Sequence, residues 1–286
     1  MAINSINTND GSFVALQNLA ATNSSLRDTQ DRISTGKKIS SAKDNGAIWA
    51  IAQNLRGASQ SINAVKNSLD RAQSSVDVAL TAGTNVADLL LQMKEKALAA
   101  SDVALDTGSR RALNEDFKVL RDTVRKTIVN ADFNGTNMIR TAGTTIRGLA
   151  NVSGTDSITV AAQNLSFYAT GVAPPATAIN TMTIGINIGT HNATAASNTL
   201  SSVNNTILNV NRALAVMGAQ YKALALHNTF MSKLQDNLDS GVGNLVDADL
   251  GRESARLQSL QSRQQLGVQA TSIANQSTSA LLGLFR

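Results

Sequence analysis

Two short segments share residues with loops that bind phosphate or calcium, and both lack groups that such loops require. Ser34-Thr-Gly-Lys-Lys38 ends like a phosphate-binding loop, in which glycine amides and a lysine hold the phosphate oxygens. The earlier glycine is absent, because position 31 is aspartate, and the residue after Lys37 is lysine instead of serine or threonine. We therefore interpret Gly36 as a helix breaker flanked by solvated lysines.

The second segment, Asp247-Ala-Asp-Leu-Gly251, has the acidic start of a calcium-binding loop. Such a loop needs glycine at its sixth position and a bidentate glutamate at its twelfth, and these positions hold Arg252 and Gln258. An aspartate side chain can instead accept hydrogen bonds from the free amides at a helix N-terminus. We predict that Asp247 or Asp249 caps a helix.

The composition provides few groups for catalysis, metal binding or nucleic-acid recognition. The chain of 286 residues has no cysteine and two histidines, His191 and His227, which lie far apart in the sequence. Aromatic residues make up 3% of the chain, and the net charge of +5 is spread along it without a basic stripe. Catalysis needs a nucleophile, a base and an orienting group, and base stacking needs aromatic side chains. We therefore expect no enzyme, no cofactor, no metal and no nucleic-acid partner.

The chain shows no features of a cleaved secretory signal or of a membrane span. It begins Met-Ala-Ile-Asn-Ser-Ile-Asn, without a basic n-region or an apolar h-region. No apolar run approaches the roughly 18 residues that a spanning helix needs, so we expect no membrane partner. A cytosolic protein, or one exported without a cleaved signal, agrees with these features.

Most of the chain outside the two polar segments described above has apolar residues at heptad spacing. This spacing predicts the helices that would position those segments. The spacing alternates between three and four residues over more than six heptads, beyond the three or four that indicate a coiled coil. At about 1.5 Å per residue, this predicts a rod of roughly 70 Å. Many of the residues are alanine or glycine, so neighbouring helices can approach closely. The seam consists of Leu55, Ala58, Ile62, Val65, Leu69, Ala72, Val76, Ala79, Gly83, Val86, Leu90, Met93, Ala97 and Ala100.

Two further segments have the same spacing. One covers residues 113–131, after a break and cap at Thr107-Gly-Ser109, and the other starts near residue 200. Glycine costs about 1 kcal/mol in a helix interior, so Gly241-Val-Gly243 is expected to loosen the later helix. The seam residues are Leu113, Phe117, Leu120, Val124, Ile128 and Ala131, and then Val203, Ile207, Val210, Leu214, Met217, Tyr221, Leu224, Met231, Leu234, Leu238, Val242 and Leu245.

The middle of the chain, residues 141–192, is rich in threonine, glycine, alanine and asparagine. Ile146–Asn151 and Ser157–Ala161 predict short strands on either side of a turn, and the alternation over Thr181–Ile188 predicts a third strand. The expected fold class is therefore mainly α, a long antiparallel helical rod or coiled coil with a small β-hairpin insertion in the middle of the chain.

The two chain ends have helical spacing but almost no charge. Residues 1–26 contain one charged residue, Asp10, and residues 264–285 contain none. A helix that faces water normally carries more charge, so we predict that these ends are buried in an assembly. The alternative is a poorly soluble helical hairpin packed on its own domain. One face has Leu16, Leu19, Leu26 and Ile33, and another has Leu266, Ala270, Ile273, Ala280 and Leu284.

Signatures at both ends resemble those of bacterial flagellins. The segment Arg32-Ile-Ser-Thr-Gly-Lys-Lys-Ile-Ser-Ser-Ala-Lys-Asp-Asn-Gly-Ala-Ile-Trp-Ala-Ile-Ala52 resembles the N-terminal signature, as do Ile6–Asn9 and Leu16–Leu19. Ala274–Arg286 resembles the flagellin tail, and Leu238–Asp249 is most similar to flagellins of alphaproteobacteria. The resemblance covers about residues 1–140 and 200–286, and the middle of the chain adds little to it.

The resemblance implies a structural subunit that self-assembles into the bacterial flagellar filament for swimming motility. It implies an inner domain from residues 1–42 and 246–286, and an outer rod of four antiparallel long helices from residues 43–140 and 193–245. Residues 141–192 would form a small β-rich insertion. It also implies type III export to the extracellular filament. The implied partners are further copies of the chain, other flagellins, hook-associated junction and cap proteins, the flagellar export machinery and an export chaperone.

The resemblance further implies that the two chain ends pair as a coiled coil lining a central channel. Apolar residues of the ends would form the polymerisation interface, namely Ile6, Leu16, Leu19, Leu26, Ile33, Leu266, Ile273, Leu284 and Phe285. A channel wall of amides and hydroxyls would offer sliding chains neither strong charge nor an apolar patch. The candidates for this lining are Gln265, Gln269, Ser272, Asn275, Gln276 and Ser279.

Many flagellins contact a vertebrate Toll-like receptor through an outer-rod segment with an arginine and a leucine at set positions. The similar segment here is Leu91–Leu98, with Gln92 in place of the arginine and Lys96 in place of the leucine. Gln92 lacks the forked donors of arginine, and Lys96 brings a charge that contact would desolvate. The resemblance therefore predicts weak or no receptor activation. Simple solvation of both positions on the rod is the alternative, and it is compatible with this loss.

Two other assemblies remain as alternatives. A hook–filament junction protein shares related ends, although its tail departs from the ending Leu281-Leu-Gly-Leu-Phe-Arg286 found here. The other is a secreted coiled-coil protein that forms no filament.

Overall fold

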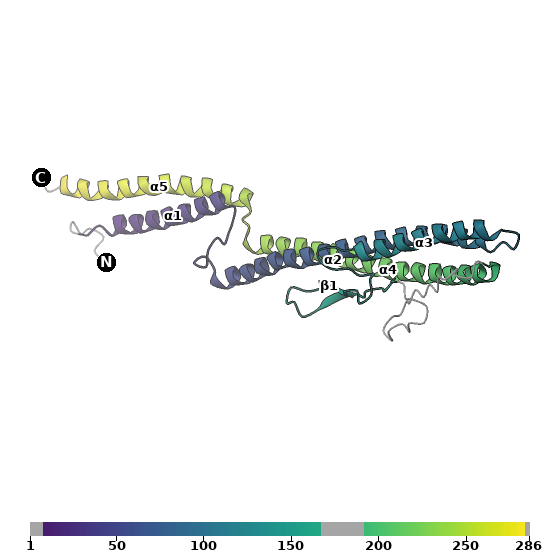
Figure 1. Ribbon diagram of the computed structural model, residues 1–286. Coiled ribbons are helices and arrows are strands. Elements are labelled where there is room, and N and C mark those ends of the chain that lie inside the picture. Colours follow the sequence, from purple (N-terminus) through teal and green to yellow (C-terminus); the bar gives the residue numbers. More distant parts are fainter. Residues whose placement is uncertain (1–7, 167–191, 284–286) are drawn as a thin grey trace. The chain divides into compact units, whose positions relative to one another are not determined.

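The computed structural model describes residues 8–166 and 192–283, and the chain divides into two compact units. Unit 1 comprises residues 1–59 and 236–286, and unit 2 comprises residues 60–235. The elements in chain order are α1 (Asp10–Thr35), α2 (Gly46–Ala100), α3 (Thr107–Asn130), β1 (Ile146–Leu149), β2 (Ser157–Val160), α4 (Ala193–Val246) and α5 (Leu250–Gly283) (Figure 1). The prediction of a mainly helical chain with a small hairpin is confirmed. The predicted strand at residues 181–188 lies outside the described residues.

The core of unit 2 is the seam that the heptad spacing predicts. Every seam position of α2 from Ile62 to Ala100 is buried, as are Phe117 on α3 and Met217 on α4. At Gly83 an added Cβ would lie 2.6 Å from Leu214 Cδ2. Glycine at this level therefore lets the Leu214 side chain of α4 pack directly on the α2 backbone, and the predicted close approach at small seam residues is confirmed.

The β-hairpin packs on α2 and α4 through a second glycine. Its strands are antiparallel, with Ile146 opposite Val160 and Leu149 opposite Ser157. A Cβ on Gly148 would lie 2.9 Å from Leu69 Cδ2 and 3.4 Å from Leu224 Cδ2, so a larger residue here would displace these side chains or the strand. Ser68 Oγ accepts a hydrogen bond from the amide of Leu149 (3.2 Å), and His227 Nε2 donates to Ala150 O (2.8 Å).

Arg110 closes the corner between α2 and α3. This arginine is buried, and its guanidinium donates from Nε to Ala100 O (2.9 Å) and from Nη2 to Asp102 O (2.7 Å) and Leu105 O (3.0 Å). The carbonyls at the end of a helix have no partner within the helix. One side chain thus satisfies the end of α2 and the loop that follows it.

Asn137 does the same for the end of α3. Its side chain is fully buried, and Nδ2 donates to Ile128 O (2.8 Å) and Val129 O (3.2 Å). The carbonyl Oδ1 accepts from the amides of Ile139 (2.9 Å) and Arg140 (3.0 Å). A single amide group therefore joins the last turn of α3 to the chain that leads into the hairpin.

The N-cap of α3 is Asp106, one residue before the predicted Thr107–Ser109 cap. Its Oδ1 accepts from the amide of Ser109 (3.0 Å), and the Ser109 hydroxyl donates to Oδ2. The pKa of the Asp106 carboxyl is lowered, mainly by the hydrogen bond from the Ser109 hydroxyl and next by the hydrogen bond from the Ser109 amide. The charged form is thus favoured in the folded state.

This lowered pKa predicts a pH dependence of stability. The cap contributes fully above the pKa of an unfolded aspartate and loses its contribution as the pH falls through the lower, folded value. We expect Asp106→Asn, which keeps an acceptor but does not titrate, to flatten the decline in urea midpoint between about pH 5 and pH 2.5. Asp88→Asn, at an exposed position inside α2, is the control. Equal declines in Asp106→Asn and the wild-type protein would contradict this assignment.

Two expectations about the helices are wrong. Gly241-Val-Gly243 does not loosen α4, which continues to Val246. The cost of two glycines is offset by burial, because Val242 and Val246 lie in an apolar cluster with Ile39 and Ala52. The outer rod was expected to have four long helices. The described part of unit 2 has three, since α2 runs without a break to Ala100.

Candidate self-assembly surface

The terminal helices α1 and α5 form an antiparallel pair in unit 1 (Figure 1). Asn9 caps α1 by accepting from the Ser12 amide (3.0 Å), and its Nδ2 donates to Ala274 O on α5 (2.8 Å). Further along, Gln264 Nε2 donates to Asn23 Oδ1 (2.7 Å). These polar contacts, with an ion pair at the other end of α1, fix the register of the two helices. The predicted pairing of the chain ends is confirmed for the described residues.

The pair has almost no core of its own. Among the described side chains of α1 and α5, only Thr29 and Leu260 are buried. Leu19 faces α5 closely, because a Cβ on Gly267 would lie 3.2 Å from its Cδ1. Large apolar side chains of both helices are instead 50–67% exposed. They are Phe13, Val14, Leu16, Leu266, Val268 and Ile273.

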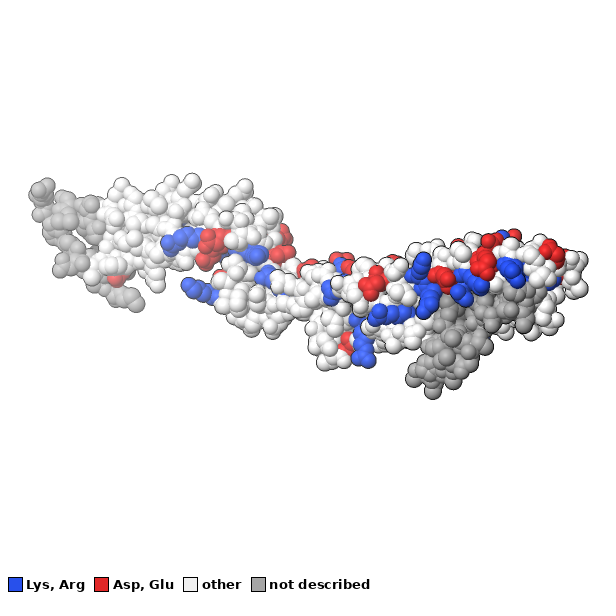
Figure 2. All heavy atoms as spheres, viewed as in Figure 1, with Lys and Arg blue, Asp and Glu red and all other residues white. Residues whose placement is uncertain are grey.

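A groove of about 430 Å³ runs between the two helices. Leu19, Leu260 and Leu266 line it, together with Asn18, Ala21, Thr22, Ser25, Arg263 and Gly267. Figure 2 shows that the surface of the α1–α5 pair is mostly free of charged side chains, whereas charged side chains are frequent over unit 2. Residues 11–26 of α1 and 264–276 of α5 carry no charge. Exposed apolar side chains on an uncharged stretch with almost no core are typical of a surface that is covered by another protein.

At one end of the pair, residues 36–39 and residues 246–248 are joined by backbone hydrogen bonds, and we call them the crossing segments. Gly36 ends α1 in the left-handed conformation (φ 68°), and its carbonyl accepts from the Ala248 amide (2.9 Å). In return, Val246 O accepts from the amides of Lys38 (2.8 Å) and Ile39 (3.3 Å). Gly36 is thus the helix breaker that the sequence predicts, and it adopts a backbone conformation that other residues rarely tolerate.

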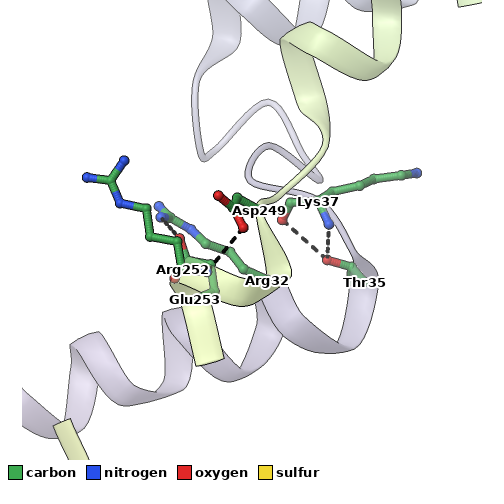
Figure 3. A network of polar contacts seen from close by, with 6 residues as sticks. All are labelled: Arg32, Thr35, Lys37, Asp249, Arg252 and Glu253. Carbon is green, nitrogen blue, oxygen red and sulfur yellow. Dashed lines mark hydrogen bonds and ion pairs between the residues drawn. The ribbon is translucent and has the colours of Figure 1, made fainter. Parts of the chain in front are cut away.

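Polar side chains hold the start of α5 beside the end of α1 (Figure 3). Asp249 caps α5 by accepting from the Arg252 amide (3.1 Å), which confirms one of the two predicted caps. Arg32 Nη1 pairs with Glu253 Oε1 at 3.3 Å, while the buried Oε2 of Glu253 has no hydrogen-bond partner in the described structure. Thr35 Oγ1 accepts from the amide of Lys37 (3.3 Å).

An apolar cluster stabilises the same end of unit 1. Trp49, the single tryptophan, packs half-buried against the four buried residues of this cluster together with Ile48, Leu55 and Leu245. Trp49 thus anchors this small cluster. The crossing segments and this cluster fix the positions of α1 and α5 at one end, and most of the exposed apolar side chains lie further along the pair.

The predicted interface residues divide into three groups. Leu16, Leu266 and Ile273 are exposed, and Leu19, Leu26 and Ile33 are half-buried. The exposed residues of α5 also include the channel-lining candidates Gln265, Gln269, Ser272, Asn275 and Gln276. Ile6, Leu284, Phe285 and the side chain of Ser279 lie outside the described residues. The spacing of the sequence missed Phe13, Val14 and Val268, which are equally exposed; their apolar character in a nearly uncharged segment was the available signal.

The two receptor-segment residues on α2 have different surroundings. Gln92 is exposed, whereas Lys96 is half-buried and its Nζ lies 3.1 Å from Asp116 Oδ2 on α3. Lys96 therefore holds an ion pair between two helices and is more than a solvated position. Among the described helices, none combines the length and apolar character required to cross a membrane.

Long packed helices with exposed apolar side chains on the terminal pair are typical of a coiled-coil protein that acts in an assembly. Residues 6–144 match the bacterial flagellin N-terminal helical region, and residues 200–285 match the bacterial flagellin C-terminal helical region. The chain is 52% identical to flagellin FljK of Caulobacter vibrioides over 286 residues, covering 100% of both chains. It is 33% identical to a flagellin of Brucella melitensis, covering 99% of both. The chain belongs to the bacterial flagellin family, and it is a structural filament subunit and not an enzyme.

A solved structure shares the fold but not the sequence. A protein from Vibrio parahaemolyticus, described as a flagellar hook-associated protein, matches with a TM-score of 0.55 and 14% identity, covering 71% of this chain and 100% of that one. At this identity the likeness concerns the fold alone. The sequence matches at both ends favour flagellin over the junction-protein alternative.

Proposed function

We propose that unit 1 is the polymerisation module of this flagellin, and that the exposed apolar side chains of α1 and α5 contact neighbouring subunits of a helical homopolymer outside the cell. The supporting observation is a helix pair on which six large apolar residues are 50–67% exposed. Burying one such side chain contributes about 1.5–3 kcal/mol. Every subunit repeats these contacts, so the stabilisation accumulates along the filament.

The uncharged polar residues of α5 suit a channel wall. Gln265, Gln269, Ser272, Asn275 and Gln276 are exposed, and none carries a charge. A passing unfolded chain would meet amides and hydroxyls that bond equally well to water, and so would not be held. Our proposal includes Ser279 in the same lining. If these side chains faced a packed core in the polymer, this part of the proposal would be wrong.

Further partners follow from the same surface. A helix pair with exposed apolar side chains can be covered by a related protein at either end of the polymer, and we include other flagellins and the hook-associated junction and cap proteins in the proposal. Before assembly the same segments would need protection, which is the role we assign to the export machinery and an export chaperone. Secretion to the extracellular filament is part of this proposal.

Single cysteines test the polymerisation surface, because the chain has none of its own. We expect Leu266→Cys to react with a maleimide in the monomer and to be protected at least tenfold in the polymer. Ser153→Cys, in the exposed hairpin turn, is the control and should react equally in both states. Equal reactivity of Leu266→Cys before and after polymerisation would overturn the proposed interface.

The receptor segment gives a separate prediction. Gln92 lacks the bidentate donors of arginine, and the Lys96 ammonium would leave Asp116 or be desolvated on contact. We expect this flagellin to activate a vertebrate Toll-like receptor reporter at least tenfold less than a strongly stimulatory flagellin. Gln92→Arg with Lys96→Leu should raise its activity. Full potency of the wild-type protein would contradict the assignment, and an unchanged double variant would show that other positions decide recognition.

A further inference from the structure

The outward face of α2 in unit 2 is acidic. Asp70, Asp77, Asp88 and Glu95 are all exposed, and at about 100° per residue their directions around the helix agree within about 20°. Between Asp70 and Glu95, α2 itself has no lysine or arginine within about 60° of this line. Lys126 of α3 lines a groove together with Asp77 and so borders this face. The buried seam residue Leu90 lies on the opposite side of the helix. At the end of this line, Asp70 Oδ1 accepts a hydrogen bond from Asn228 Nδ2 on α4 of the same subunit (2.6 Å), so Asp77, Asp88 and Glu95 are the carboxylates left for a second subunit. We call these four residues the acidic face.

The outward face of α4 in unit 2 is basic and apolar. Between Ala193 and Gln235 its charged residues are Arg212, Lys222 and Lys233, which are exposed and form no ion pair within the described part of the chain. Exposed apolar residues share this face within an arc of about 100°. They are Leu208, Ala215, Ala219, Ala223, Leu226 and Phe230, of which the three large ones are 54–65% exposed. We call these nine residues the basic face.

The charges on the two faces have matching intervals. Asp77 and Asp88 are eleven residues apart, and so are Lys222 and Lys233, which places each pair about 16 Å apart along its helix. The three alanines leave room for another helix to approach, and Leu91 at the edge of the acidic face is exposed and apolar. Such charge complementarity sets the orientation of the two partners and their association rate more than their affinity, because exposed ion pairs contribute little to the free energy of binding.

We propose that the acidic face of one subunit docks on the basic face of a second copy of the chain. This contact rests on the proposed polymerisation and adds to it a specific lateral contact between two units 2. The acidic face then selects the neighbouring α4 by charge, and the apolar residues of the basic face supply the burial. Two identical faces would bring like charges together, so pairing of a face with its own copy is disfavoured.

Charge reversal tests this contact in seeded elongation at about 50 mM salt, where screening is weak. We expect Asp77→Lys with Asp88→Lys to elongate at least tenfold more slowly than the wild-type protein, and Lys222→Glu with Lys233→Glu to do the same. The four changes together restore opposite charges across the contact and should recover at least half of the wild-type rate. Arg111→Glu with Arg125→Glu, on exposed positions of α3, changes the charge equally and should stay within about twofold of wild type.

The outcomes separate this contact from polymerisation itself. Wild-type elongation supports the proposed function whatever the variants do. If wild type elongates and either single-face variant keeps pace with it, the contact is overturned while polymerisation stands. The contact is also overturned if the fourfold variant recovers nothing, or if the α3 control slows equally. Circular dichroism of each monomer verifies that these surface changes leave the helices folded.

Discussion

A Leu266→Asp variant is expected to remain a folded monomer and to lose the ability to elongate filament seeds. Leu266 is 63% exposed in the single chain, so the change removes little that holds the monomer together. In the polymer it would forfeit about 1.5–3 kcal/mol of burial per contact and would also desolvate a carboxylate. The lost burial free energy alone predicts at least tenfold slower elongation. Because every variant subunit along the filament would lose the same contact, we expect elongation to be lost completely. Electron microscopy after seeding measures it.

A conservative change at the same position is the matched control. Leu266→Met keeps the apolar character and volume and should elongate within about threefold of wild type. The helical circular dichroism and the thermal midpoint of Leu266→Asp should equal those of wild type, since the side chain lies on the surface of α5. Normal filaments from Leu266→Asp would refute the assignment of α5 to the interface. Ile273→Asp should behave in the same way, because Ile273 is equally exposed.

Arg110→Ala is expected to lower the free energy of unfolding by about 3 kcal/mol. The guanidinium is buried and donates to the carbonyls of Ala100, Asp102 and Leu105 at the corner between α2 and α3. Alanine would remove these three hydrogen bonds and would leave Asp102 O only its bond from the Leu105 amide (3.3 Å). Urea unfolding monitored by circular dichroism measures the change. Arg111→Ala, the adjacent exposed arginine, is the control and should stay within about 0.5 kcal/mol of wild type.

A lysine at this position distinguishes geometry from charge. Arg110→Lys keeps the positive charge but cannot spread fixed donors over three carbonyls, so most of the loss should remain. If Arg110→Ala and Arg111→Ala had equal effects, the corner would not depend on the guanidinium.

The sequence predicted those parts of the fold that depend on periodicity. The three- and four-residue spacing from Ile62 to Ala100 identified the buried seam, because a helix must turn one apolar stripe toward its neighbours. The turn between β1 and β2 followed from local residue types. The near absence of charge at both ends indicated that α1 and α5 need partners, although charge alone could not separate the side chains that face each other from those that face outward.

Features that depend on the meeting of distant residues could not be predicted. A buried arginine such as Arg110 has no periodic signal, because its place is set by free carbonyls at a helix end. The same holds for Asn137, and for Gly148, whose need to lack a side chain arises only when the hairpin meets Leu69 and Leu224. The glycines near the end of α4 misled the prediction because local propensity is weaker than the burial of Val242 and Val246.

A side-chain-resolution electron cryomicroscopy map of filaments grown from this protein tests the polymerisation surface most directly. We expect Leu16, Leu266 and Ile273, which are at least half exposed in the single chain, to be buried between neighbouring subunits. Gln269 and Gln276 should face a central channel in the same map. Filaments in which Leu16, Leu266 and Ile273 remain in contact with solvent, while subunits touch only through unit 2, would contradict the assignment of polymerisation to the terminal helices.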